Sequence, residues 1–200
     1  MSRPRSLGRK MLEHAFKEWA AICDALGDGR QGLILRKGGI SEHNGEFTPD
    51  YTRFWLYPTY THQQEQGIKS EANRPRTSRH TDSFQGKVLL RHFAEVTVTA
   101  YVGEWDILRS LDRWHCWTPE TVLKRFQYRD PGMYILGVRV YAVPRPFQVL
   151  ETDSYRGCRS WVELESAKPT DGAKPVVDDS TYESWVAQWS ALLDRDGTAA

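Results

Sequence analysis

The sequence has few of the features that identify a membrane protein, a disulfide-linked secreted protein or a general polyanion binder. Its three cysteines, Cys23, Cys116 and Cys158, contain no CxxC pair, and an odd number argues against a disulfide framework. No apolar run approaches the roughly 20 residues that span a bilayer. Basic and acidic residues number 27 and 26, so the net charge of +1 predicts only local contact with nucleic acid. We expect a cytoplasmic protein without membrane contact.

The length of 200 residues suits one domain with extensions. Residues 1–10 are basic but have no apolar signal core, which predicts a flexible N-terminus. The single domain is expected over 11–165, followed by a polar linker over 166–179, a C-terminal helix over 180–193 and a tail over 194–200. The helix is expected to begin with a capping box formed by Ser180 and Glu183.

Periodicity predicts the secondary-structure elements. Apolar residues three and four positions apart predict a helix over 11–26, and shorter helices are expected over 104–113 and from Thr118. Alternating or β-branched segments predict strands over 31–37, 53–60, 88–102, 133–143, 147–150 and 160–164. The first two strands are expected to be antiparallel neighbours. Because strands cluster without alternating with helices, the predicted fold is α+β, with a mainly antiparallel, curled sheet or small barrel flanked by helices.

Aromatic residues are abundant, with 8 Trp, 9 Tyr and 7 Phe. Large rings bury much area per residue, so most are expected in the core. We expect Trp19 to be buried on the inner face of the first helix and Trp55 in the central strand.

Residues 64–86 contain almost no apolar side chains. A segment of this length is either a mobile surface loop or a functional one. Because it is rich in arginine, the functional interpretation is a basic flap that a substrate orders.

Polar residues follow two of the predicted strands. Arg36 and Lys37 precede Gly38-Gly39, an arrangement that can present charge and amide groups to a phosphate or carboxylate, or simply end a solvated strand. Thr59, His62 and Gln63 lie at or just beyond the proline that interrupts the strand of Trp55, and rigid elements commonly position binding residues in this way. The candidate binding residues therefore include Arg36, Lys37, Trp55, Thr59, His62 and Gln63.

The remaining candidates are Trp114 and His115 in the segment Trp114-His115-Cys116-Trp117. The two tryptophans form either a stacking platform for a base or a corner of the core. His62, His92 and His115 have no helical i, i+4 spacing, so no metal site is predicted. The residues identify no cofactor.

Several motifs together resemble a known family. They are Phe16-Lys17-Glu18-Trp19, Leu35-Arg36-Lys37-Gly38-Gly39, Phe54-Trp55-Leu56-Tyr57-Pro58-Thr59 with His62-Gln63, and Leu111-Asp112-Arg113-Trp114-His115-Cys116-Trp117. The sequence is similar, over about 13–164, to the bacterial domain of unknown function 1802. The resemblance implies no established activity, but it implies a link to restriction-type DNA metabolism.

Three functional hypotheses remain open. The first is a non-catalytic binding module for nucleic acid or a nucleotide. The second is a hydrolase that acts on a phosphate ester, with His62 or His115 as general base. The third is an accessory module that binds a protein partner through its aromatic residues. The sequence predicts neither the ligand nor the oligomeric state.

Overall fold

The computed structural model describes residues 11–37, 42–43, 46–47, 49–60, 67–70, 86–155 and 160–194. Its strands are β1 (Met11–Trp19), β2 (Leu33–Arg36), β3 (Glu42–His43), β4 (Glu46–Phe47), β5 (Arg53–Thr59), β6 (Lys87–Val102), β7 (Met133–Leu150), β8 (Trp161–Pro169) and β9 (Lys174–Pro175). Its α-helices are α1 (Ala20–Gly27), α2 (Trp105–Ser110), α3 (Pro119–Phe126) and α4 (Asp179–Leu193), and short 3-10 turns cover Asp112–Trp114 and Asp153–Tyr155.

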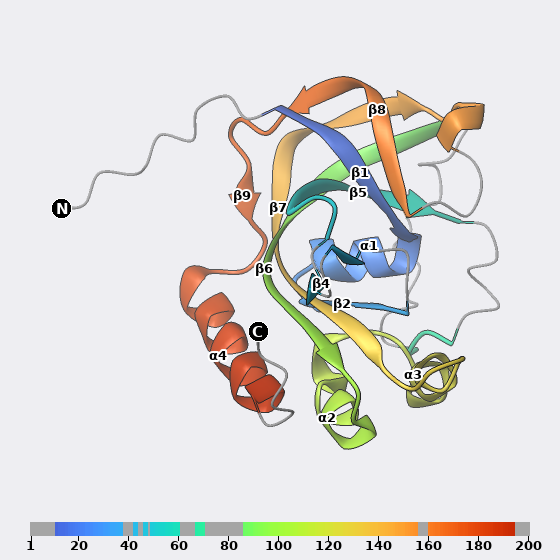
Figure 1. Cartoon of the computed structure of the whole chain (residues 1–200). Helices are drawn as coiled ribbons and strands as arrows, with labels where there is room; N and C mark the ends of the chain where they lie inside the picture. The colour runs from blue at the N-terminus through green and yellow to red at the C-terminus, as the bar shows by residue number, and fades with distance from the viewer. Residues whose placement is uncertain are drawn as a thin grey trace.

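A seven-stranded sheet forms the centre of the fold. Its strand order is β2-β7-β6-β5-β1-β8, with β9 paired to β7. Among the described ladders only β1 and β5 are parallel. The predicted α+β class with a mainly antiparallel sheet is therefore confirmed. The long strands β6 and β7 curve around α1 (Figure 1), and the strand order stays open, because no described ladder joins β2 to β8.

The helix predicted over 11–26 is wrong in its first half, where the chain forms β1. This strand lies between β5 and β8, and its neighbouring residues Ala15 and Phe16 are both fully buried on opposite faces. A strand buried on both faces loses the apolar–polar alternation that identifies it, so its residues also fit a helical spacing. The helical half is correct, since α1 begins directly after Trp19. Trp19 itself is only partly buried.

The predicted pairing of the next two strands is also wrong. β2 pairs antiparallel with β7, whereas β5 lies between β6 and β1. Residues 54–57 of β5 are all buried, so both faces of this strand are packed in the core. Its backbone pairs with β1 on one side and β6 on the other. The four-residue β2 serves instead at the sheet edge, and the small β3–β4 hairpin lies between β2 and β5 in the chain.

The late strands are longer than predicted. β7 is continuous through the two prolines, Pro144 and Pro146, that were expected to interrupt it. The β6–β7 register jumps from His92 opposite Ala142 to Leu90 opposite Phe147. The prolines therefore lie at a bulge, where a missing N–H breaks no ladder bond. β8 and β9 occupy parts of the predicted 166–179 linker.

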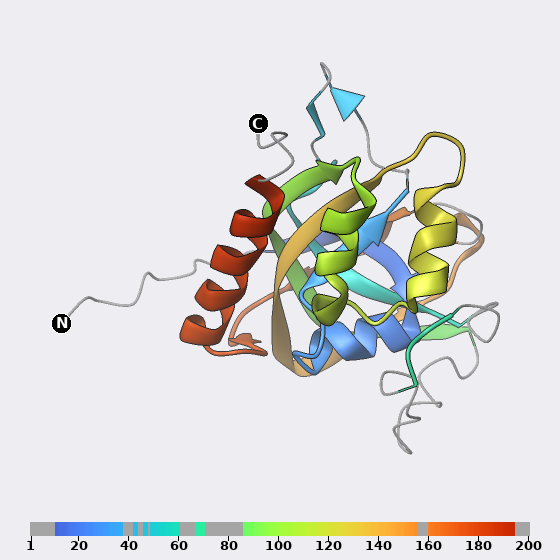
Figure 2. The same ribbon diagram turned by 90° about the horizontal axis from the view of Figure 1, so that it is seen from below.

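The C-terminal helix α4 packs across β6 and β7 on the outside of the sheet (Figures 1 and 2). It begins as predicted to within one residue, but its N-cap is Asp178, whose carboxylate accepts the Thr181 N–H at 2.8 Å. The helix docks through Trp189, which is fully buried. Gly137 of β7 makes room for this ring, because a Cβ atom there would lie 2.9 Å from it.

Part of the predicted 64–86 loop is packed against the domain. Ile68 forms a bridge with Trp117 and is buried, and the Lys69 N–H donates to the Cys116 carbonyl at 2.8 Å. Residues 64–66 and 71–85 lie outside the described residues, as do the predicted N-terminal segment 1–10 and tail residues 195–200. Within the described ranges, no helix has both the length and the apolar character needed to cross a membrane.

Candidate functional site

The ends of the two parallel strands bring Glu18 and Thr59 together. Because β1 and β5 run in the same direction, with Trp19 opposite Thr59, their C-terminal ends meet at one edge of the sheet. The Thr59 hydroxyl donates to the Glu18 carbonyl oxygen at 3.1 Å. Polar groups from two strands therefore converge where both strands leave the core.

Glu18 is a buried carboxylate, with only 6% of the residue exposed. Its Oε1 accepts the backbone N–H of Trp19 at 2.8 Å. Burial raises the pKa of the Glu18 carboxyl, because removal from water disfavours the charged form, while Arg36, the Trp19 N–H and Arg125 oppose that shift. A buried acid with two cations nearby is a common feature of functional sites and also of structural ion pairs.

Arg36 reaches this carboxylate from the end of β2. Its Nη1 lies 3.8 Å from Glu18 Oε2, and its Nη2 donates to the hydroxyl of Ser160, just before β8. The guanidinium carbon lies 4.9 Å from the centre of the Phe16 ring. The curvature of the sheet thus brings opposite edges, β2 and β8, to the same charged group. Arg36 keeps 22% of its side chain exposed.

Arg125 adds a second guanidinium from α3. It lies over the Trp117 ring, 3.8 Å from its centre, and burial lowers its pKa, opposed by Glu18 and reinforced by Arg36. We call Glu18, Thr59, Arg36, Arg125 and Ser160 the Glu18 cluster. Within this cluster Arg36 lies beside the Glu18 carboxylate, and the charge of Arg125 also acts on it.

Lys37 is placed elsewhere, although it is adjacent to Arg36 in sequence. Its ammonium group donates to the carbonyl oxygens of Phe126 at 3.1 Å, Gly132 at 2.7 Å and Asp130. An ammonium group has three donors, and here all three satisfy carbonyl groups at and beyond the C-terminal end of α3. This side chain stabilises a helix end.

Trp55 lies in the core, which confirms the prediction that it is buried in a central strand. The residue is 0% exposed, its rings pack edge-on against Phe93 and Phe147, and its Nε1 donates to the Leu12 carbonyl at 3.1 Å. Along β5 it points away from the Glu18 side chain, because Phe54 and Leu56 belong to the opposite core layer, which also contains Phe16.

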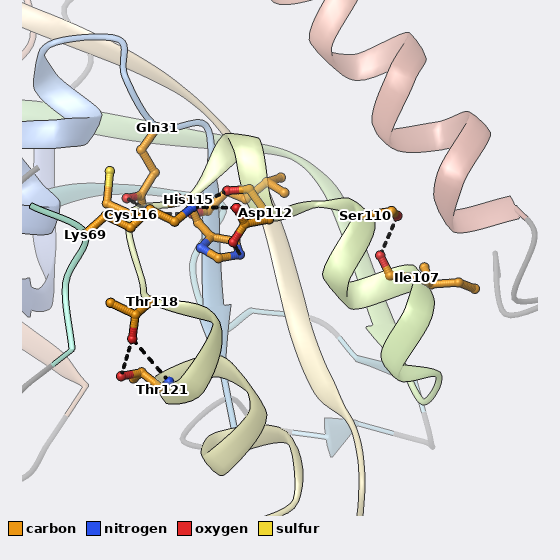
Figure 3. Close-up of polar contacts among 10 residues, drawn as sticks. Gln31, Lys69, Ile107, Ser110, Asp112, His115, Cys116, Thr118 and Thr121 are labelled. Atoms are coloured by element: carbon orange, nitrogen blue, oxygen red, sulfur yellow. Dashed lines mark hydrogen bonds and ion pairs between the residues drawn. The ribbon is translucent and has the colours of Figure 1, made fainter. Parts of the chain in front are cut away.

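Trp114 and His115 are both buried in a corner of the fold, where Figure 3 shows His115 beside Asp112 and Cys116. Trp114 packs against Trp189. The Lys69 ammonium donates to the Asp112 carboxylate at 2.8 Å, and also to the backbone carbonyls of Asp112 and His115. The corner is closed further by Gln31, whose amide oxygen accepts the Cys116 N–H at 3.1 Å.

His115 has 1% of its side chain exposed, and its Nε2 lies 3.9 Å from an Asp112 carboxylate oxygen. Burial, followed by the positive charge of Lys69, lowers the pKa of the imidazole to about 4, against a smaller opposing effect of Asp112. The imidazole is therefore neutral at physiological pH and has no surface from which to reach a ligand.

His62 and Gln63 lie outside the described residues. Of the candidate binding residues, Arg36 lies beside the Glu18 carboxylate and Thr59 donates to the Glu18 backbone carbonyl, whereas the contacts of Lys37, Trp55, Trp114 and His115 lie elsewhere. No group of three potential metal ligands occurs among the residues that the structure describes.

Sequence reasoning missed Glu18, Arg125 and Ser160 as site residues. A signal for Glu18 exists, since Phe16 and Glu18 are two positions apart, and a strand would place both on one face. The helical interpretation of 11–26 concealed that relation. Arg125 and Ser160 carry no comparable local signal, because Arg125 comes from α3 and Ser160 reaches β1 through the pairing of β1 with β8, where the Lys17 N–H donates to its carbonyl at 2.8 Å.

Fold and site define an α+β protein with an arginine–glutamate cluster where two parallel strands end. The family model described as "Domain of unknown function (DUF1802)" matches residues 15–188. The chain belongs to this family, which confirms the predicted resemblance. No curated protein matches the chain significantly.

Two solved structures illustrate what the fold is similar to. ASCH from Zymomonas mobilis is 13% identical, with a TM-score of 0.46, over 87% of this chain and 93% of that chain. A serine-to-alanine mutant of the Zymomonas mobilis ASCH protein is 10% identical, with a TM-score of 0.47, over 90% of this chain and 98% of that chain.

Proposed function

We propose that this chain is a non-catalytic binding module for nucleic acid or a nucleotide, and that Arg36 and Arg125 contact the phosphate. The observation that carries the proposal is the partly exposed Arg36 guanidinium, which lies 3.8 Å from the buried Glu18 carboxylate and over the Phe16 ring, with the charge of Arg125 acting on the same carboxylate. A guanidinium group matches the geometry of phosphate oxygens and is weakly hydrated, so arginine is well suited to a partly buried phosphate contact.

The positions of the two arginines support the same interpretation. Each guanidinium lies over an aromatic ring, Arg36 over Phe16 and Arg125 over Trp117, so ring contacts limit its movement. Ser160 adds a hydroxyl group that already contacts Arg36. A net charge of only +1 for the chain means that attraction of a polyanion depends on local groups such as these.

The test is fluorescence anisotropy with labelled single-stranded DNA and RNA and with a labelled nucleotide, at low and moderate salt. Arg36→Gln is expected to weaken binding about tenfold or more, and to reduce the slope of log affinity against log salt by about 0.7, the value for one phosphate contact on a single strand. Arg109→Gln is the matched control, because Arg109 is exposed on α2 and pairs with Asp106 of the same helix. Its binding is expected to change less than twofold.

Removal of Arg36 leaves Glu18 buried with less compensation, so the variant could lose stability. The double variant Glu18→Gln/Arg36→Gln removes both charges, so the loss of binding can be tested without leaving an uncompensated buried carboxylate. Absence of binding to the wild type at low salt, or equal affinity in Arg36→Gln and wild type, would refute the proposal.

Hydrolysis of a phosphate ester is the second candidate function. The raised pKa of the Glu18 carboxyl, beside Arg36, favours it, because a carboxyl group whose pKa is raised is suited to act as a general acid or base. The burial of His115 argues against the hypothesis that this histidine is the general base of a hydrolase. Release of product from single-stranded RNA, DNA or a chromogenic phosphate ester by the wild type, and its loss in Glu18→Gln with binding retained, would establish an enzyme. No turnover by the wild type would leave the binding module.

A further inference from the structure

A set of aromatic side chains continues the face of β1 on which the Glu18 cluster lies. The rings of His14 and Tyr51 are stacked, with centres 3.6 Å apart and planes 15° from parallel. Tyr51 meets the Trp161 ring edge-on at 5.2 Å. All three residues are partly exposed, in contrast to Phe16 and Phe54, the fully buried rings on which Trp161 rests. We call His14, Tyr51 and Trp161 the aromatic surface.

The register of the sheet places this surface next to Arg36. His14, Phe16 and Glu18 are two residues apart on β1, so their side chains share one face. Phe16 pairs with Trp161 across β1 and β8. The Arg36 guanidinium lies over the Phe16 ring and donates to Ser160, the residue directly before Trp161. A strand advances about 3.3 Å per residue, so the step from His14 to Glu18 is about 13 Å.

Charge and aromatic rings in this order match the two ends of a nucleotide. A phosphate at Arg36 would leave its base, or that of its neighbour, within reach of the aromatic surface. Bases of a single strand expose their faces to such rings, whereas those of a duplex are stacked on one another. The aromatic surface therefore favours a single strand over a duplex among the nucleic acids of the proposed function.

We propose that the ligand is single-stranded nucleic acid, with one base stacked on the aromatic surface and the adjacent phosphate on Arg36. This inference rests on the proposed function, because it takes the phosphate contact as its starting point. Sequence tolerance is expected, since every base has a face to stack.

The test uses three probes of equal length, namely a single-stranded oligonucleotide, the same backbone with abasic sites, and a duplex, measured at one salt concentration. The wild type is expected to bind the base-containing strand about 5- to 100-fold more tightly than the abasic one, which is the effect of stacking one base. Tyr51→Leu is expected to lose this preference and to retain the affinity for the abasic strand. Tyr51→Phe keeps the ring and is expected to keep the preference. Thermal melts of both variants verify that they are folded.

The outcomes separate this inference from the proposed function. Equal binding of the base-containing and abasic strands, with both weakened by Arg36→Gln, would overturn the stacking and leave the phosphate contact in place. Tighter binding of the duplex would also overturn it. No binding of any probe would overturn the proposed function and this inference together.

Discussion

The buried imidazole of His115 predicts a pH dependence of stability. In the folded protein its pKa is lowered from 6.5 to about 4, mainly by burial and then by Lys69. In the unfolded chain it titrates near 6.5. Between these values the unfolded chain binds a proton that the folded protein does not, so stability rises with pH in this window. The stabilisation is fully present above about pH 6.5 and is lost as the pH falls toward 4.

The size of the effect follows from the same two values. A fall of the pKa from 6.5 to about 4 corresponds, at about 1.4 kcal/mol per pH unit, to roughly 3 kcal/mol. This is a substantial part of the 5–15 kcal/mol typical of small domains. Titration of His115 alone is therefore expected to make the protein markedly less stable at pH 4.5 than at pH 7.

The measurement is urea unfolding of wild type and His115→Gln at half-unit intervals from pH 7.5 to 4. Glutamine retains polar groups but does not titrate. The difference in free energy of unfolding between the two proteins is expected to shrink or reverse by roughly 3 kcal/mol as the pH falls. Contributions of the other acids cancel in this difference, provided that they do not couple to His115. A constant difference across the range would refute the reasoning.

Three further substitutions test the packing that positions the site. Lys37→Met removes the donor to three carbonyl groups around the end of α3 and is expected to cost about 1–3 kcal/mol in a urea melt, against little change for the exposed Lys124→Met. Gly137→Ala places a Cβ 2.9 Å from a tryptophan ring of α4 and is expected to cost about 1–3 kcal/mol, whereas Gly103→Ala has no contact closer than 3.8 Å and serves as control. Trp55→Ala empties a fully buried site and is expected to cost about 3–5 kcal/mol, measured by thermal or urea unfolding.

Local signals in the sequence predicted those elements whose structure depends on local chemistry. Thr118 followed by Pro119 predicted the start of α3, and the Thr118 hydroxyl does accept the Thr121 N–H. The alternation over 88–102 predicted β6 almost to the residue. In both cases the deciding interaction lies within a few residues, or on one half-exposed face, so the pattern survives in the sequence.

The failures share a physical cause. β1 and β5 are buried on both faces, and a strand in that position carries apolar side chains without alternation, so neither the type of β1 nor the partner of β5 is encoded locally. The Glu18 cluster depends on this same arrangement. Its members come from β1, β2, β5, α3 and the start of β8. Pairing of β1 with β5 and β8 brings Thr59 and Ser160 to Glu18, and the curved sheet brings Arg36 of β2 to the same place.

Glu18 and His115 show why burial alone does not identify a functional group. Burial disfavours the charged form of both, raising the pKa of the carboxyl and lowering that of the imidazole. The Lys69 ammonium donates to three oxygens of the corner around His115, whose side chain is only 1% exposed. Glu18 differs, because the Arg36 guanidinium beside it keeps 22% of its side chain exposed. An anion can therefore reach Arg36 from solvent, whereas the His115 side chain is enclosed, and it is this difference that directs the functional proposal to β1.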